Sequence, residues 1–142
     1  MFFLCQIYNI MEFSTVNIHG GSHCFIKAKI EGIDTTLLLD TGSSNSALDK
    51  KFIHDNNLKM EKSEFPIIGY NSIDVSGMRT KATMNIDNNT NETIFEVLCL
   101  DYMNKIYSDN NIKPIDGIFG CDMMNRYKAT IDFRNNSIIL NG

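Results

Sequence analysis

One short segment of the sequence has the composition of a catalytic turn. Asp40 ends an apolar run of three leucines and is followed at once by Thr41 and Gly42. A carboxylate at the end of an apolar run costs free energy unless its surroundings use the charge. Gly42 leaves room for backbone N–H groups to approach the carboxylate, and Thr41 has a hydroxyl that can fix the turn. By itself the tripeptide is a weak signal, because aspartate at a strand end is commonly only a turn former.

The elements that must position Asp40 are short strands separated by turn residues, which predicts a mostly β domain. The expected strands cover residues 13–18, 23–30, 35–39, 65–70, 78–86, 92–100, 129–133 and 137–140. Short helices fit residues 47–58 and 121–127, where apolar residues recur at helical spacing. Residues 31–34 and 87–91 are expected to be turns, and residues 101–114 a longer connection. Asp40 is then delivered by the return strand of a hairpin.

Two segments resemble one protein family. The segment LLLDTGSSNS, residues 37–46, resembles the active-site loop of retropepsin-like aspartic proteases, and the hairpin before it has that family's spacing. The segment DGIFGCDMM, residues 116–124, resembles the apolar-apolar-Gly segment and short helix of the same family. Residues 127–133 are similar to its bacterial, single-domain branch. The resemblance covers residues 12–142 and implies a mostly β, closed-barrel acid protease fold with one or two short helices.

The resemblance also implies a reaction. In aspartic proteases two carboxylates share a proton and activate a water that attacks the peptide carbonyl. This sequence has only one Asp-Thr-Gly, at Asp40, so the consistent solution is a two-fold symmetric homodimer with one Asp40 from each protomer. Thr41, Gly42 and Ser43 would support the active site, and Ile118 would pack behind the turn, close to the substrate groove.

A flap is the family's other moving part, because a β-hairpin closes over the substrate and excludes water. Residues 66–82 are the candidate, with a tip near Val75, Ser76, Gly77 and Met78. This region matches the family weakly. Its candidate residues rest on the resemblance and on their place between two expected strands.

Charge and hydropathy exclude several classes of protein. The net charge is −4, and no block rich in lysine or arginine is present, so nucleic acid is not an expected partner. No stretch is long enough to span a bilayer. Residues 1–11 form an apolar arm without the basic start of a secretory signal, which favours the cytoplasm. The arm is expected to pack on something, with the dimer interface as one place, and residues 12–142 form the protease domain.

Metal and cofactor sites are not indicated. Four cysteines have no CxxC spacing, and each has apolar neighbours, so reduced, buried thiols are expected; they are Cys5, Cys24, Cys99 and Cys121. A long-range disulfide stays open at the level of sequence. The three histidines, His19, His23 and His54, do not share a helix face, so we expect no metal.

Three functions fit these observations. The first is an active homodimeric endopeptidase that cleaves extended peptides. The second is a catalytically silent dimer of the same fold that binds peptides or serves as an assembly module. The third is a monomer whose second half-site comes from another protein. Substrate preference and pH optimum do not follow from the sequence.

Overall fold

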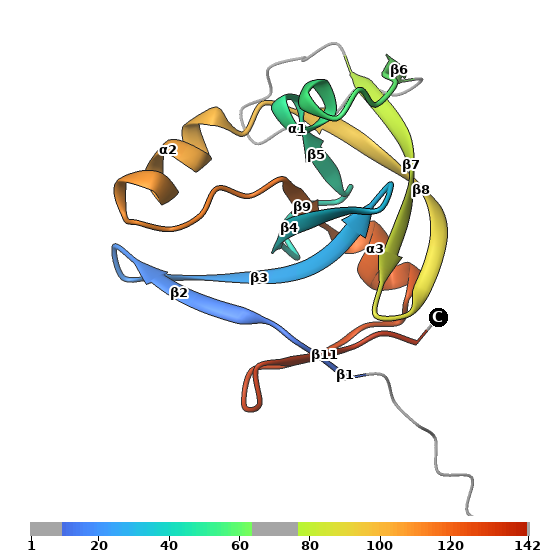
Figure 1. Cartoon of the computed structure of the whole chain (residues 1–142). Helices are drawn as coiled ribbons and strands as arrows, with labels where there is room; N and C mark the ends of the chain where they lie inside the picture. The colour runs from blue at the N-terminus through green and yellow to red at the C-terminus, as the bar shows by residue number, and fades with distance from the viewer. Residues whose placement is uncertain (1–9, 64–76, 142) are drawn as a thin grey trace, which may run out of the picture.

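Six strands close into a barrel in the computed structural model, which describes residues 10–63 and 77–141 (Figure 1). In spatial order they are β3 (Gly21–Ile30), β4 (Ile33–Leu39), β9 (Gly117–Phe119), β5 (Ala47–Asp49), β8 (Asn89–Leu98) and β7 (Met78–Ile86). Pairing of β7 with β3 closes the ring. The sheet continues beyond the ring into β2 (Ser14–Ile18), beside β3, and β6 (Glu61–Lys62), beside β7. The expectation of a mostly β, closed-barrel fold is confirmed.

A second, smaller sheet lies below the barrel in Figure 1. It contains β1 (Ile10–Glu12), β11 (Ser137–Ile139) and β10 (Thr130–Asp132) in that order. The closing hairpin is therefore where the sequence predicts it. The N-terminal arm expected over residues 1–11 reaches into β1, which pairs with β11 of its own chain. Residues 1–9 lie outside the described part, so the interfacial role of the arm stays a prediction.

Tight hairpins give the barrel its long strands. His19 and Gly20, Glu31 and Gly32, and Asp87 and Asn88 each provide two successive residues with positive φ. Two such residues in a row are the geometry of a type I′ turn, whose twist matches the strands it joins. The turn expected over residues 87–91 is consequently shorter than predicted, and β8 begins already at Asn89.

The apolar run before Asp40 is buried on both faces of β4, as its composition predicts. Leu37 points into the cluster inside the barrel, together with Ile26, Phe95 and Phe119. Leu38 points the opposite way, into a second cluster that includes Tyr107. Alternation along a strand explains this division, because successive side chains leave on opposite faces. The strand that carries Asp40 is thus fixed from two sides.

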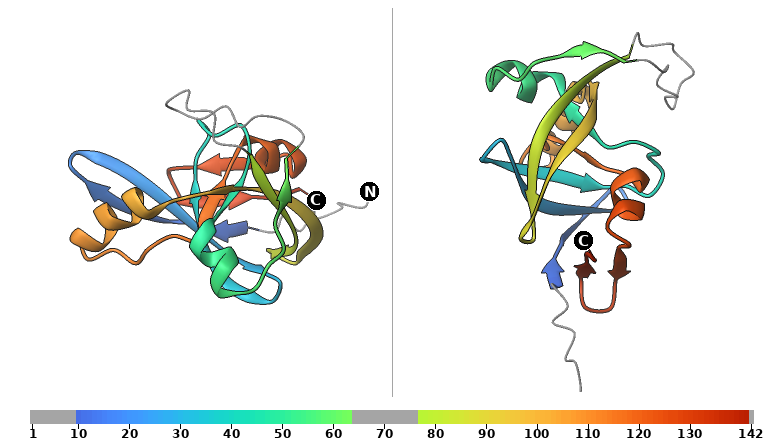
Figure 2. Two further views of the ribbon diagram at one scale, coloured as in Figure 1. Left: turned by 90° about the horizontal axis from the view of Figure 1, so that it is seen from above. Right: turned by 90° about the vertical axis from the view of Figure 1, so that its right-hand side faces the viewer.

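The second cluster exists because residues 101–114 are not an irregular connection. Residues Asp101–Asp109 form the helix α2, which lies beside the β2–β3 ribbon in both Figure 1 and Figure 2. Met103, Ile106 and Tyr107, spaced as on one helix face, pack against the apolar cluster of that ribbon. Asp101 stands in the first turn, where a negative charge is favourable. The expectation of a connection was wrong over this range, and the helical spacing was the missed signal.

The other two helices are short. Helix α1 (Lys50–Asp55) follows β5, and α3 (Cys121–Arg126) follows β9. With α2, the described residues contain three helices, one more than the largest number expected. None of the helices in residues 10–63 and 77–141 is long and apolar enough to cross a membrane.

Candidate active site

The barrel brings the two sequence motifs side by side. Strand β4 pairs in parallel with β9, so that Leu38 lies opposite Ile118 and Leu39 opposite Phe119. The pairing continues past the end of β4, because the backbone N–H of Asp40 donates to the carbonyl oxygen of Phe119 at 3.0 Å. Asp40 is therefore anchored through backbone atoms at the point where it leaves the sheet.

The carboxylate of Asp40 is held by its own turn. The N–H of Gly42 donates to Oδ1 of Asp40 at 2.8 Å, and the N–H of Ser43 donates to the Asp40 carbonyl at 3.2 Å. A Cβ at position 42 would lie 3.1 Å from Oδ1, which explains why glycine suits this position. Asp40 is half-buried, whereas Thr41 and Gly42 are exposed. The turn thus presents a fixed carboxylate on an open face.

Thr41 has a polar side chain that makes no contact within the turn. Among the described residues its hydroxyl has no hydrogen-bond partner, while its carbonyl accepts a hydrogen bond from the Cys121 thiol at 2.9 Å. The backbone of Thr41 is therefore held by α3, and the side chain is left available on the same open face as the carboxylate of Asp40.

Helix α3 supports the loop that follows the turn. The N–H of Cys121 donates to the carbonyl of Ser43 at 2.8 Å, and the N–H of Asp122 donates to the carbonyl of Ser44 at 3.2 Å. Gly120 is required by this close contact, because a Cβ there would lie 2.7 Å from the Ser43 oxygen. The loop and the start of α3 therefore form one unit.

Ser46 and Asp122 complete that unit, and sequence reasoning did not single them out as site residues. Oδ1 of Asp122 accepts hydrogen bonds from the Ser46 N–H at 2.9 Å and from the Ser46 hydroxyl at 2.7 Å. The Ser46 oxygen in turn accepts from the N–H of Gly120 at 2.9 Å. Ser46 is fully buried. In the sequence, a serine shortly after the Asp-Thr-Gly turn and an aspartate just after the apolar-apolar-Gly segment could have indicated this pair of residues.

Ser43, expected as an active-site support, acts on the loop. Its hydroxyl donates to the carbonyl of Asn45 at 2.7 Å. Its backbone N–H and carbonyl bond to Asp40 and Cys121, so the residue links the carboxylate turn to α3. The contribution of Ser43 in this structure is to shape the loop.

Ile118 and Asp116 lie behind the turn. Ile118 is 6% exposed and belongs to the second cluster, so the structure places it in the core beneath α2. Asp116 exchanges hydrogen bonds with Thr36: its carboxylate accepts the Thr36 N–H at 2.9 Å, and its N–H donates to the Thr36 carbonyl at 2.8 Å. Burial raises the pKa of Asp116, and the Thr36 hydrogen bond partly offsets this. These contacts give Asp116 a structural role behind the turn.

A hollow of about 440 Å³ opens beside Asp40 and Thr41. One wall comes from the N-terminal part of β3, including His23, and another from Ile131 and Phe133 near the closing hairpin. Phe133 is 67% exposed although it is a large apolar side chain. Asp40 thus borders a hollow that is mainly apolar and has one imidazole in its wall.

The flap candidates lie at the edge of the described residues. Gly77 and Met78 belong to a paired stem: Met78 lies opposite Lys62, and the carbonyl of Gly77 accepts the N–H of Ser63 at 2.6 Å. Val75, Ser76 and the strand expected over residues 65–70 fall outside the described part of the chain. Their role stays a prediction.

In the described part of the chain, no group of cysteine, histidine and acidic side chains is placed so that it could hold a metal ion. Cys24, Cys99 and Cys121 are free thiols. Cys24 is buried as predicted, but Cys99 and Cys121 are exposed, so the expectation of burial was wrong for them. Cys99 lies just beyond β8 and Cys121 at the first position of α3, where neighbouring apolar residues turn inward instead. Cys5 lies outside the described residues.

Comparison with known proteins agrees with this geometry. Residues 26–122, more than half of the chain, match the family model described as aspartyl protease, and the chain belongs to this family. The match begins in β3 and ends at Asp122, so it contains both motifs. No curated protein sequence matches significantly.

Three solved structures show the same fold. A retropepsin-like aspartic protease from Rickettsia conorii is 19% identical with a TM-score of 0.57, covering 93% of this chain and 87% of that one. The EIAV protease in complex with the inhibitor HBY-793 is 18% identical with a TM-score of 0.55, covering 83% and 100%. The retroviral protease-like domain of Ddi1 from Leishmania major is 15% identical with a TM-score of 0.53, covering 83% and 87%. The retropepsin-like fold expected from the sequence is confirmed.

Proposed function

We propose that this protein is a homodimeric aspartic endopeptidase whose catalytic pair consists of Asp40 from each protomer. The observation that supports this proposal most is the geometry of the turn that carries Asp40. A single carboxylate is fixed by Gly42 at 2.8 Å and faces an open side of the molecule next to the unpartnered hydroxyl of Thr41. This is half of an acid–base pair, and a second copy of the chain can supply the other half.

The chemistry requires the pair. Two carboxylates held close together cannot both ionise, so the pair carries one proton and one negative charge near neutral pH. The ionised carboxylate removes a proton from a water molecule, whose oxygen attacks the peptide carbonyl carbon. The protonated carboxyl gives its proton to the carbonyl oxygen. Collapse of the tetrahedral intermediate then breaks the C–N bond, and a proton goes to the leaving amine.

The two-fold axis would pass between the Asp40 turns. Thr41 and Gly42 are exposed in the single chain, and in this proposal they become buried against the partner's turn. Peptide substrate would lie extended across both half-sites and pair with strand edges. The flap candidate, residues 66–82, would close over it; residues 66–76 of that candidate lie outside the described part of the chain.

Substitution of Asp40 tests the catalytic part of the proposal. Asp40→Asn should lower cleavage of a peptide library by roughly 10²- to 10⁴-fold, since acid–base catalysis contributes about that factor. Asp34→Asn is a matched control, because the Asp34 side chain is 94% exposed in the β3–β4 turn region. Cleavage by the Asp40→Asn protein at the wild-type rate would exclude Asp40 as the catalytic residue.

Sedimentation tests the dimer. We expect a dimer whose dissociation at low protein concentration abolishes cleavage, because activity then follows the dimer population. A strict monomer at high concentration would contradict the homodimer, and a monomer that still cleaves peptides would point to a half-site from elsewhere. A stable dimer that cleaves no peptide would favour the catalytically silent binding or assembly module instead.

A further inference from the structure

A histidine and a tyrosine form a hydrogen-bonded pair beside Asp40, and the proposed reaction leaves them without a role. His23 lies in β3 and lines the same hollow as Asp40. Its Nδ1 atom lies 2.8 Å from the hydroxyl oxygen of Tyr107. Tyr107 comes from α2, so the pair joins two elements that are 84 residues apart in the sequence.

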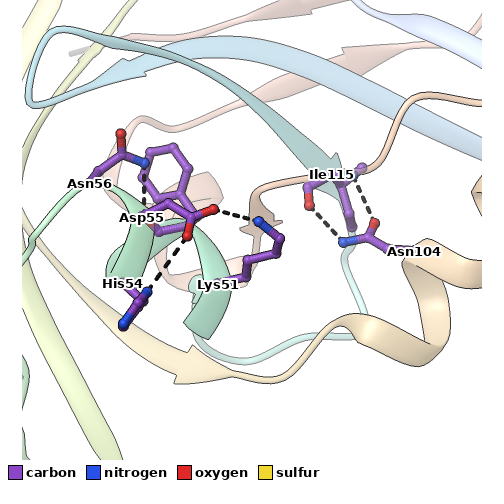
Figure 3. A network of polar contacts seen from close by, with 7 residues as sticks. Lys51, His54, Asp55, Asn56, Asn104 and Ile115 are labelled. Atoms are coloured by element: carbon purple, nitrogen blue, oxygen red, sulfur yellow. Dashed lines mark hydrogen bonds and ion pairs between the residues drawn. The ribbon is translucent and has the colours of Figure 1, made fainter.

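The tyrosine is fixed in position. Tyr107 is fully buried, and its ring packs edge-to-face on both His23 and Phe25, with centroid distances of 5.4 Å in each case. Helix α2 is itself tied down by the Asn104 side chain, which donates to the carbonyl of Ile115 at 3.0 Å and accepts from its N–H at 2.8 Å (Figure 3). The phenol therefore meets the imidazole on a rigid support.

The position of the phenol determines which nitrogen of His23 carries the hydrogen. Burial, and to a smaller extent the negative charge of Asp40, raises the pKa of Tyr107 to about 12, so the phenol keeps its proton at neutral pH. A buried O–H group needs an acceptor, and within residues 10–63 and 77–141 Nδ1 of His23 is the one that it meets. Neutral His23 therefore accepts at Nδ1 and has its hydrogen on Nε2.

That Nε2–H group is the donor that His23 has left for a ligand. His23 lines the hollow and is partly exposed, whereas Tyr107 lies behind it and is not part of the wall. The two ring nitrogens point in divergent directions, so the one that does not meet the phenol points away from it. The lining of the hollow is more apolar than polar: Ile131 and Phe133 are among its apolar residues, and Ser22 and Thr41 among its polar ones. A donor fixed in such a hollow discriminates between ligands, because a ligand without an acceptor leaves that donor unpaired.

We propose that His23 is a specificity residue, which donates its Nε2–H to an uncharged acceptor on a substrate side chain with an apolar body, such as glutamine or tyrosine. This inference rests on the proposed function, since it assigns a substrate class to the same site. An anionic side chain such as glutamate is disfavoured, because the Asp40 pair carries a negative charge beside the same hollow. Tyr107 acts as a positioning residue through His23.

The test uses the full-length protein and a peptide library varied one position at a time. Binding is measured with the Asp40→Asn protein and cleavage with the wild type. At one position next to the cleaved bond, glutamine should be preferred over methionine in both assays, and over the isosteric glutamate in cleavage by the wild type, where the Asp40 pair carries its charge. His23→Phe, which removes both nitrogens, should reduce this preference by roughly two- to tenfold, the factor contributed by one neutral hydrogen bond. His23→Gln, which keeps an amide donor, should retain part of it.

Two further variants make the result specific. Tyr107→Phe removes the hydroxyl that donates to Nδ1 of His23, so the hydrogen of the ring is no longer held on Nε2. This variant should weaken the preference for glutamine without removing peptide binding. His54→Phe is the matched control, since the His54 side chain is 87% exposed on α1 and has no place in the hollow; it should leave the preference unchanged. Nitrogen-15 NMR of the His23 ring should show a protonated Nε2 and an unprotonated Nδ1 in the wild type, and a changed tautomer balance in Tyr107→Phe.

The inference is overturned if His23→Phe retains the wild-type preference, if no peptide binds the Asp40→Asn protein, or if Nδ1 carries the hydrogen. These outcomes are separate from failure of the proposed function. Cleavage without any preference for glutamine would exclude the role of His23 but not the protease function. A glutamine preference in binding that depends on His23, together with unchanged cleavage by Asp40→Asn, would support the role of His23 and exclude Asp40 as the catalytic residue.

Discussion

Ser46→Ala should destabilise the protein more than any ordinary serine substitution, because the Ser46 hydroxyl satisfies two buried groups. It accepts from the Gly120 N–H at 2.9 Å and donates to Oδ1 of Asp122 at 2.7 Å, and the residue is fully buried. Alanine removes both contacts and supplies neither a donor nor an acceptor. The loop that follows Asp40 and the start of α3 then keep fewer hydrogen bonds between them.

The magnitude follows from what each partner retains. The Gly120 N–H is left buried without an acceptor, which costs about 1–3 kcal/mol. Oδ1 of Asp122 still accepts from the backbone N–H groups of Ser46 and Met123, at 2.9 and 2.8 Å, so its loss lies at the low end, about 0.5–1 kcal/mol. We therefore expect the free energy of unfolding to fall by roughly 1.5–4 kcal/mol, the sum of the two contributions.

Urea unfolding of the wild type and the variant at one protein concentration measures this difference, since dimerisation would make apparent stability depend on concentration. Ser44→Ala is the matched control. Ser44 lies two residues away in the same loop and is exposed, and within the described residues its hydroxyl has only a long 3.5 Å contact with the Asn45 amide. Its substitution should therefore change stability by less than about 0.5 kcal/mol. A Ser46→Ala protein as stable as Ser44→Ala would refute the reasoning that this hydroxyl holds the loop.

Three other substitutions probe the same site. Gly120→Ala places a Cβ 2.7 Å from the Ser43 carbonyl oxygen, so it should lower the free energy of unfolding by about 1–3 kcal/mol and reduce cleavage. Urea unfolding and peptide turnover measure these two effects, and unchanged values would contradict the close contact. Asp116→Asn should stabilise the protein at neutral pH and lose that advantage in acid, as urea unfolding at several pH values will show. The folded-state pKa of Asp116 is raised, so its favourable contribution is present below the unfolded value and is lost as pH rises through the folded one; the opposite trend would contradict the burial argument. Thr41→Val should leave monomer unfolding nearly unchanged but weaken the dimer by about 0.5–1.5 kcal/mol for each hydroxyl, measured by sedimentation, whereas equal dimer affinity would exclude the hydroxyl from the interface.

The strands near Asp40 could be predicted because their determinants are local. Alternating apolar residues, the Glu31–Gly32 turn and the three leucines together specify a hairpin whose return strand ends at Asp40. Leucines buried on both faces required a partner on each side, and the structure provides the barrel interior and the second cluster. Type, order and approximate bounds of these elements follow from spacing alone.

The residues that sequence reasoning missed depend on contacts distant along the chain. Ser46 and Asp122 are 76 residues apart, and their hydrogen bonds form only once β9 has entered the sheet between β4 and β5. Helix α2 was missed for a different reason. Its apolar face is narrow and most of its other residues are polar, so the helical spacing of Met103, Ile106 and Tyr107 is a weak signal that is easily missed. The pair of His23 and Tyr107 depends on that helix and on a contact between residues 84 positions apart, which the sequence alone does not indicate.

The turn that carries Asp40 is held mainly by backbone atoms. This explains why only a few residue types in the sequence indicate its position. Asp40 is anchored by the carbonyl of Phe119, and Ser43 and Ser44 are anchored by the N–H groups that begin α3. Such contacts restrict side chains only where space is short, at Gly42 and Gly120, or where a buried group needs a partner, at Ser46. Retropepsin-like structures only 15–19% identical to this chain share its fold, which is what positioning by backbone contacts permits. Side chains near the turn that do not hold it in place, Thr41 and His23 among them, are those that can distinguish one partner or substrate from another.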